Sequence, residues 1–103
     1  MTLPALTAQQ RSDALARAAD ARLRRARAKD AIKHGRMSLS EFLEQAKQDE
    51  ALGRMRVLNL LLALPRVGTR TAEALMDEIG ISPTRRVRGL GSRQRAELIA
   101  RFG

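Results

Sequence analysis

Apolar residues recur at helical spacing along this chain, and no segment alternates apolar and polar residues as a strand does. Between Thr7, a good helix N-cap, and Lys33 there is no Gly or Pro and Ala is frequent, which predicts a long helix. Its apolar stripe is thin, so we expect this helix to project from the body or to be partly disordered. Gly35 is expected to end it in the left-handed conformation, with His34 capping the last turn and having no catalytic role.

The next helices are predicted from a capping signal and from hydrophobicity. Ser38 and Glu41 have the spacing of a capping box, which predicts a short helix over residues 39–48. Residues 49–53 are interpreted as an acidic segment followed by a turn. Residues 54–64 are the most apolar stretch and stop at a proline, which predicts the central buried helix of the fold.

Two further helices are predicted at the C-terminal end of the chain. Gly68 or Thr69 caps the first, and Gly80 ends it with a left-handed turn. Ser92 is expected to cap the last helix, which runs toward Phe102. We expect three apolar side chains to pack inward from the connection between these helices: Ile81, Val87 and Leu90.

The fold class predicted from these elements is all-α. A chain of 103 residues accommodates one compact domain and an extension. We expect residues 1–36 to form a basic N-terminal helical arm and residues 37–103 to form a compact helical domain.

Charge points to a polyanionic partner. The chain has 20 basic and 11 acidic residues, a formal net charge of +9, which suits DNA, RNA or an anionic membrane surface. A solvated surface from an arginine-rich proteome would explain why Arg outnumbers Lys, but it explains the excess of bases less readily.

Several classes of protein are excluded by composition. There is no Cys and a single His, so disulfides, thiolate catalysis and a Cys- or His-based metal site are excluded, and no metal or cofactor is expected. No apolar run approaches the ~18 residues of a membrane span, and the N-terminus lacks the pattern of a secretory signal. We therefore expect a cytoplasmic protein.

Two arginine-bearing turns are the candidate binding site. Each ends an apolar run, contains Gly and precedes a helix N-terminus, where free N–H groups and partial positive charge favour a phosphate. Gly permits close approach, hydroxyls donate, and guanidinium groups grip phosphates bidentately. The predicted contacts are Arg66, Gly68, Thr69, Arg70, Thr71, Arg85, Arg86, Arg88, Gly91, Ser92 and Arg93. Arg54 and Arg56 are expected to stay solvated or to reach toward a ligand.

The basic half of the N-terminal helix is a second candidate surface. It either forms a solvated face with a few intrahelical ion pairs or lies along a phosphate backbone, and its local positive excess favours the backbone. The additional DNA contacts predicted there are Arg22, Arg24, Arg25, Arg27 and Lys29. Because the chain has no Trp or Tyr to stack on bases, a dedicated single-strand binder is disfavoured. Whether arginines read a sequence or a groove shape stays open.

These residues also resemble a known family. The run Leu64-Pro65-x-Val67-Gly68-x-x-x-Ala72, then Gly80-Ile81, then Arg85-Arg86-Val87-Arg88-Gly89-Leu90-Gly91, resembles the actinobacterial (mycobacterial-type) integration host factor. Similarity continues in the opening Leu3-Pro4-x-Leu6-Thr7, in residues 49–55 and in the terminal Phe102-Gly103. The N-terminal arm departs from the family pattern in its many arginines.

The resemblance implies an S13-like helix-two-turns-helix domain in a nucleoid-associated protein that binds and shapes duplex DNA and supports phage integration. By position, it implies contacts from the backbone at residues 68–71 and from Arg85, Arg86 and Arg88. A structured-RNA or ribosomal S13-like protein is the alternative, although the long basic C-terminal tail of S13 is missing. A glycosylase would need zinc-binding cysteines, so no enzyme is expected. A monomer is expected, because no apolar seam suggests a dimer, and whether copies cooperate on DNA stays open.

Overall fold

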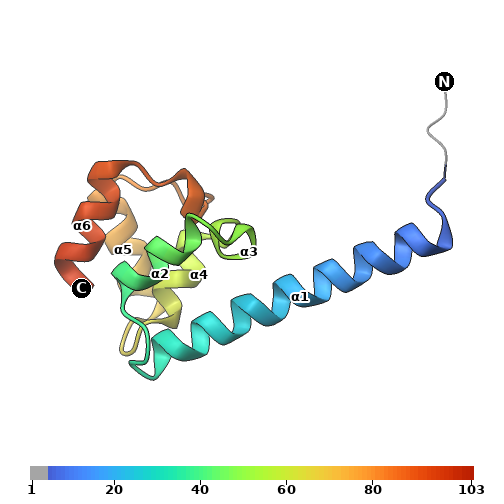
Figure 1. Ribbon diagram of the computed structural model, residues 1–103. Coiled ribbons are helices and arrows are strands. Elements are labelled where there is room, and N and C mark those ends of the chain that lie inside the picture. Colours follow the sequence, from blue (N-terminus) through green and yellow to red (C-terminus); the bar gives the residue numbers. More distant parts are fainter. Residues whose placement is uncertain (1–4) are drawn as a thin grey trace.

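The computed structural model describes residues 5–103 and shows a long helix projecting from a compact helical body (Figure 1). The predicted all-α fold is confirmed, and no strand occurs within these residues. The opening Leu3-Pro4 of the resemblance lies outside the described range. The elements follow in the order α1 (Ala8–Lys33), α2 (Leu39–Ala46), α3 (Glu50–Gly53), α4 (Val57–Ala63), α5 (Thr69–Ile79), the 3₁₀ helix η1 (Val87–Gly89) and α6 (Ser92–Phe102).

Helix α1 is an arm of which only the C-terminal part is docked. Residues 8–20 are all exposed, whereas Ala28 and Ile32 are buried against the body, where α1 packs on α3 and α4. The molecule extends over 48 × 33 × 24 Å with a radius of gyration of 16.0 Å, against about 13 Å for a compact chain of 100 residues. The arm therefore projects, as the thin apolar stripe predicts.

The predicted N-caps of the first two helices are confirmed by their hydrogen bonds, whereas the second helix ends at Ala46, two residues before its predicted end. Thr7 caps α1 in a capping box with Gln10, and Ser38 caps α2 in a capping box with Glu41. Gly35 has a φ of 72°, the left-handed conformation that glycine adopts without strain. These ends depend on contacts between residues three or four apart, so they are set locally.

The central apolar helix is shorter than predicted. Helix α4 begins at Val57, because the backbone before it pairs with a distant segment. The Val57 N–H donates to the Arg85 carbonyl at 2.9 Å, and the Val87 N–H donates to the Met55 carbonyl at 2.8 Å. Arg56 and Arg86 thus face each other in an antiparallel bridge. The acidic segment at residues 49–53 forms the short helix α3, which Asp49 caps, and the predicted turn follows at Arg54.

One aliphatic core joins the body and the docked part of the arm. Helices α4 and α5 pack together, and α2 packs on both α3 and α6. The fully buried large side chains are Phe42, Ile32, Leu39, Leu60, Leu61, Leu98, Val57 and Val87. Because the core includes a residue of α1 and one of the α5–α6 connection, it fixes the position of both basic segments.

Candidate nucleic-acid interface

The turn between α4 and α5 presents an open helix N-terminus. Gly68 is the N-cap of α5, and no side chain hydrogen-bonds to the first turn. Thr69, Arg70 and Thr71 are all exposed, so their backbone N–H groups and side chains face solvent. Arg66, also exposed, has a φ of 68°, a conformation that is uncommon outside glycine. The turn can therefore offer backbone donors and two guanidinium groups to an anion.

The connection between α5 and α6 holds its arginines outward because its apolar residues point inward. Val87 and Leu90 are buried, as predicted, while Arg85, Arg86 and Arg88 are exposed. The Arg85 Nη1 donates to the Gly89 carbonyl at 3.0 Å, and the Arg86 Nη1 donates to the Arg54 carbonyl at 2.6 Å. Within residues 5–103 no hydrogen bond or ion pair involves the Arg88 side chain.

The start of α6 packs against the end of α5. The Arg93 Nη2 donates to the Ile79 carbonyl at 2.7 Å, and the Gln94 Nε2 donates to the Gly80 carbonyl at 3.0 Å. Arg93 thus satisfies a carbonyl at the C-terminus of α5, where cations are favoured. The predicted Ser92 cap is one residue off: Gly91 is the N-cap, and its N–H donates to the Gln94 side chain.

The two helix N-termini do not converge on one point. Since the C-terminus of α5 meets α6, the two N-termini are separated by the length of α5, which has 11 residues. At about 1.5 Å per residue this is roughly 15 Å. In Figure 1 the α4–α5 turn lies near the α1–α2 turn, at the opposite end of the body from the α5–α6 connection. A single phosphate cannot contact both, whereas a duplex, which rises about 3.4 Å per step, could span them over about four steps.

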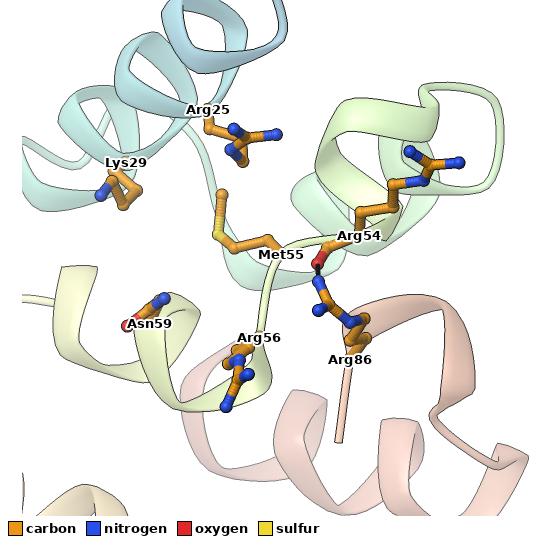
Figure 2. Close-up of a pocket in the computed structure, with 7 residues that line it drawn as sticks. All are labelled: Arg25, Lys29, Arg54, Met55, Arg56, Asn59 and Arg86. Carbon is orange, nitrogen blue, oxygen red and sulfur yellow. Dashed lines mark hydrogen bonds between the residues drawn. The ribbon is translucent and has the colours of Figure 1, made fainter. Parts of the chain in front are cut away.

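A cationic hollow of about 310 Å³ lies between α1 and the body. Three segments build it: α1, the α3–α4 connection with the start of α4, and the α5–α6 connection (Figure 2). We call it the basic hollow, and it is lined by Arg25, Lys29, Arg54, Met55, Arg56, Asn59 and Arg86. None of these residues is acidic, so the hollow is a region of concentrated positive charge.

The residues of the basic hollow were only partly predicted. Arg25, Lys29 and Arg86 are predicted contacts, Arg54 and Arg56 are expected either to stay solvated or to reach toward a ligand, and Asn59 is not predicted. Figure 2 shows the Arg54 guanidinium directed away from the centre, in keeping with its ion pair with Glu50. The sequence leaves Arg56 between these two alternatives because its position next to the apolar run predicts a helix, whereas the structure places it before α4. The Arg-x-Arg pattern just before the apolar run was the available signal.

The remaining predicted contacts on α1 differ in their hydrogen-bond partners. Arg24 donates to Asp20 at 3.0 Å and to Asp49 at 2.9 Å, which ties α1 to the start of α3. The hydrogen bond that Arg24 donates to Asp49 is the largest cause of a raised pKa for Arg24. Arg22 and Arg27 are exposed. Arg24 is therefore engaged within the fold, whereas Arg25 and Lys29 face the hollow.

The similarity of this chain to known proteins identifies the class of protein to which it belongs. Residues 32–102 match the family model of the S13-like H2TH domain, the helix-two-turns-helix arrangement that the resemblance implies. The chain is 52% identical over 103 residues to the integration host factor of Mycobacterium tuberculosis, covering 100% of this chain and 98% of that protein. It is 48% identical to the integration host factor of Streptomyces coelicolor, covering 100% of this chain and 96% of the relative.

A solved structure gives the same assignment. The structure of sIHF bound to an 8 bp palindromic DNA superposes with a TM-score of 0.82 at 46% identity, covering 84% of this chain and 98% of that one. The chain belongs to the integration host factor family, which confirms the resemblance. No helix among residues 5–103 is long and apolar enough to cross a membrane.

Proposed function

We propose that this protein binds double-stranded DNA mainly through the phosphate backbone and shapes it, in a non-catalytic, nucleoid-associated role. Family membership supports the role, since the neighbouring sIHF structure is bound to DNA. A formal net charge of +9 favours a polyanion. The relatives' name suggests that the protein supports phage integration.

The two arginine-bearing turns carry this proposal. Neither residues 63–72 nor residues 81–93 include an acid, and all their arginines are exposed. The α5 N-terminus has no side-chain cap, so its N–H groups can donate to phosphate oxygens. Because these donors recognise phosphate and carry no sequence information, the binding is expected to depend little on base sequence.

The arm enlarges the proposed footprint. We divide the chain into a basic arm, residues 1–36, and a DNA-binding domain, residues 37–103. Arg22, Arg25, Arg27 and Lys29 are exposed or half-buried and add phosphate contacts in this arrangement. We propose a monomer that acts in the nucleoid.

Arg88 and Arg70 are the best residues for testing duplex binding. Three other arginines donate hydrogen bonds to backbone carbonyls, so an alanine variant of any of them would also lose a structural contact: Arg85, Arg86 and Arg93. Arg88→Ala and Arg70→Ala should each weaken binding to a 20 bp duplex while leaving the melting temperature unchanged. The charge-matched control is Lys47→Ala on α2, where Lys47 contacts only Glu44 among the described residues.

The dependence on salt provides a second readout. The logarithm of the affinity should fall linearly with the logarithm of salt concentration, by about 0.9 per phosphate contact. Arg88→Ala should lower that slope by about one contact, and Lys47→Ala should leave it unchanged. An affinity that barely changes with salt, or tighter binding to structured RNA than to duplex DNA in competition, would contradict the proposal.

A further inference from the structure

We propose that the basic hollow is a phosphate-binding site that joins the arm to the body and shares Arg86 with the α5–α6 connection. The ligand is a doubly charged phosphate group or a pair of adjacent phosphates, held by side chains from three segments. It shares Arg25, Lys29 and Arg86 with the proposed function, but it is tested with a small phosphate compound, so the two proposals can fail separately.

The first argument is the placement of like charges. The bridge between Arg56 and Arg86 sets two arginines directly opposite each other, a pairing that is destabilising when nothing neutralises it. Arg25 and Lys29 line the same hollow from α1, although Figure 2 shows the Lys29 nitrogen turned to the side away from the bridge. No ion pair involves any of these four side chains within the described part of the chain. An anion in the hollow would offset their mutual repulsion.

The second argument is the rigidity of the hollow. Met55, at its base, is buried, and the backbone on either side of Arg56 is fixed by two hydrogen bonds to the α5–α6 connection. The Arg86 guanidinium is oriented by its bond to the Arg54 carbonyl, which leaves its other N–H groups free to donate. On the opposite wall, Ala28 and Ile32 anchor the turn of α1 that carries Arg25 and Lys29. Preorganised donors lose less entropy when they bind an anion.

The third argument is size and shape. A volume of about 310 Å³ is at the lower end of the range for small-ligand sites. A concave surface lined by one sign of charge focuses the potential more strongly than a flat one. Guanidinium groups bind phosphate in a bidentate manner, and Lys29 adds a point charge. Asn59 provides an amide that can donate to a phosphate oxygen.

The test is a titration of ¹⁵N-labelled full-length protein with sodium pyrophosphate at constant ionic strength. We expect saturable amide shifts at Lys29, Arg56, Asn59 and Arg86. Arg56→Ala should weaken the affinity roughly tenfold or more, since a hydrogen bond to a charged group is lost. This variant keeps the backbone bridge, and its amide spectrum reports whether the fold is intact. Lys29→Ala is the second variant, with a smaller loss expected, and Lys47→Ala should bind as wild type does.

Competition with a 20 bp duplex identifies the source of the phosphate. If the duplex displaces pyrophosphate, the site is upheld with the DNA backbone as its ligand. If both bind together, it is upheld with a free phosphate compound as its ligand. Shifts that do not saturate, shifts spread over every basic surface, or equal affinities of Arg56→Ala and Lys47→Ala would overturn it. If Arg56→Ala loses pyrophosphate binding but still binds the duplex, the basic hollow is not required for the proposed duplex binding.

Discussion

Arg24 and Asp49 connect the arm to the body through one charged hydrogen bond. The Arg24 Nη1 donates to the Asp49 Oδ2 at 2.9 Å, across 25 positions of sequence. Asp49 also accepts from the Ala51 N–H at 3.0 Å, so it caps α3 with its other oxygen. One carboxylate therefore starts a helix of the body and holds the arm that carries Arg25 and Lys29.

Two substitutions at Asp49 should separate these roles. Asp49→Asn keeps a good helix cap but removes the charge, so we expect greater mobility of α1 with little loss of stability. Asp49→Ala removes both, and should lower the free energy of unfolding by about a further 1 kcal/mol. Chemical denaturation measures the stability, and ¹⁵N relaxation of α1 measures the mobility.

The matched control is Asp20→Asn, which removes only the intrahelical partner of Arg24. It should leave the relaxation of α1 near Arg25 unchanged. If Asp49→Asn also leaves it unchanged, burial of Ala28 and Ile32 alone orients the arm, and the ion pair is incidental.

Local signals predicted most of the fold. The caps at Thr7 and Ser38 and the end at Gly80 each depend on partners within a few residues. After Gly80, the Ile81 N–H donates to the Met76 carbonyl at 2.7 Å, which turns Ile81 back onto the core as predicted. Such chemistry can be read directly from the order of residues.

The predictions from the sequence were wrong where contacts with a distant segment determine the local structure. In the sequence, Arg54 and Arg56 directly precede the apolar run and are expected in the first turn of its helix. In the structure, the pairing with residues 85–87 places them before α4. The basic hollow is hidden for the same reason, because it depends on how Ala28 and Ile32 dock α1 beside that pairing. The residue types were visible in the sequence, but their proximity was not.

Acidification should weaken the end of α1. Hydrogen bonding from Arg36 at 2.6 Å is the main cause of a lowered pKa for Asp30, assisted by the charges of His34, Arg36 and Lys33. Because the folded pKa is below the ordinary value of 3.8, the resulting stability is present above that pH. It is lost as the pH falls through the lower folded pKa.

The variant Asp30→Asn should therefore melt at a lower temperature than the wild type at pH 7 and at the same temperature at pH 2. Thermal unfolding at several pH values measures this difference. Asp13→Asn, an equal change of charge on the exposed part of the same helix, should match the wild type at pH 7. If the difference in melting temperature between Asp30→Asn and the wild type does not change with pH, the carboxylate charge does not contribute to the stability.

Arg66 combines backbone strain with a charge that faces solvent. Its φ of 68° costs a residue with a Cβ about 1–2 kcal/mol, a cost that glycine does not have. Since glycine also gains entropy in the unfolded chain, Arg66→Gly should stabilise the protein by at most about 1 kcal/mol. Arg66→Ala keeps the strain and removes the charge, so its stability should equal that of the wild type.

Chemical denaturation and duplex affinity, measured on both variants, separate the two effects. If the guanidinium contacts DNA, both variants lose affinity equally. Loss in Arg66→Gly alone would show that the rigid turn matters and the charge does not, and a destabilised Arg66→Gly would refute the strain.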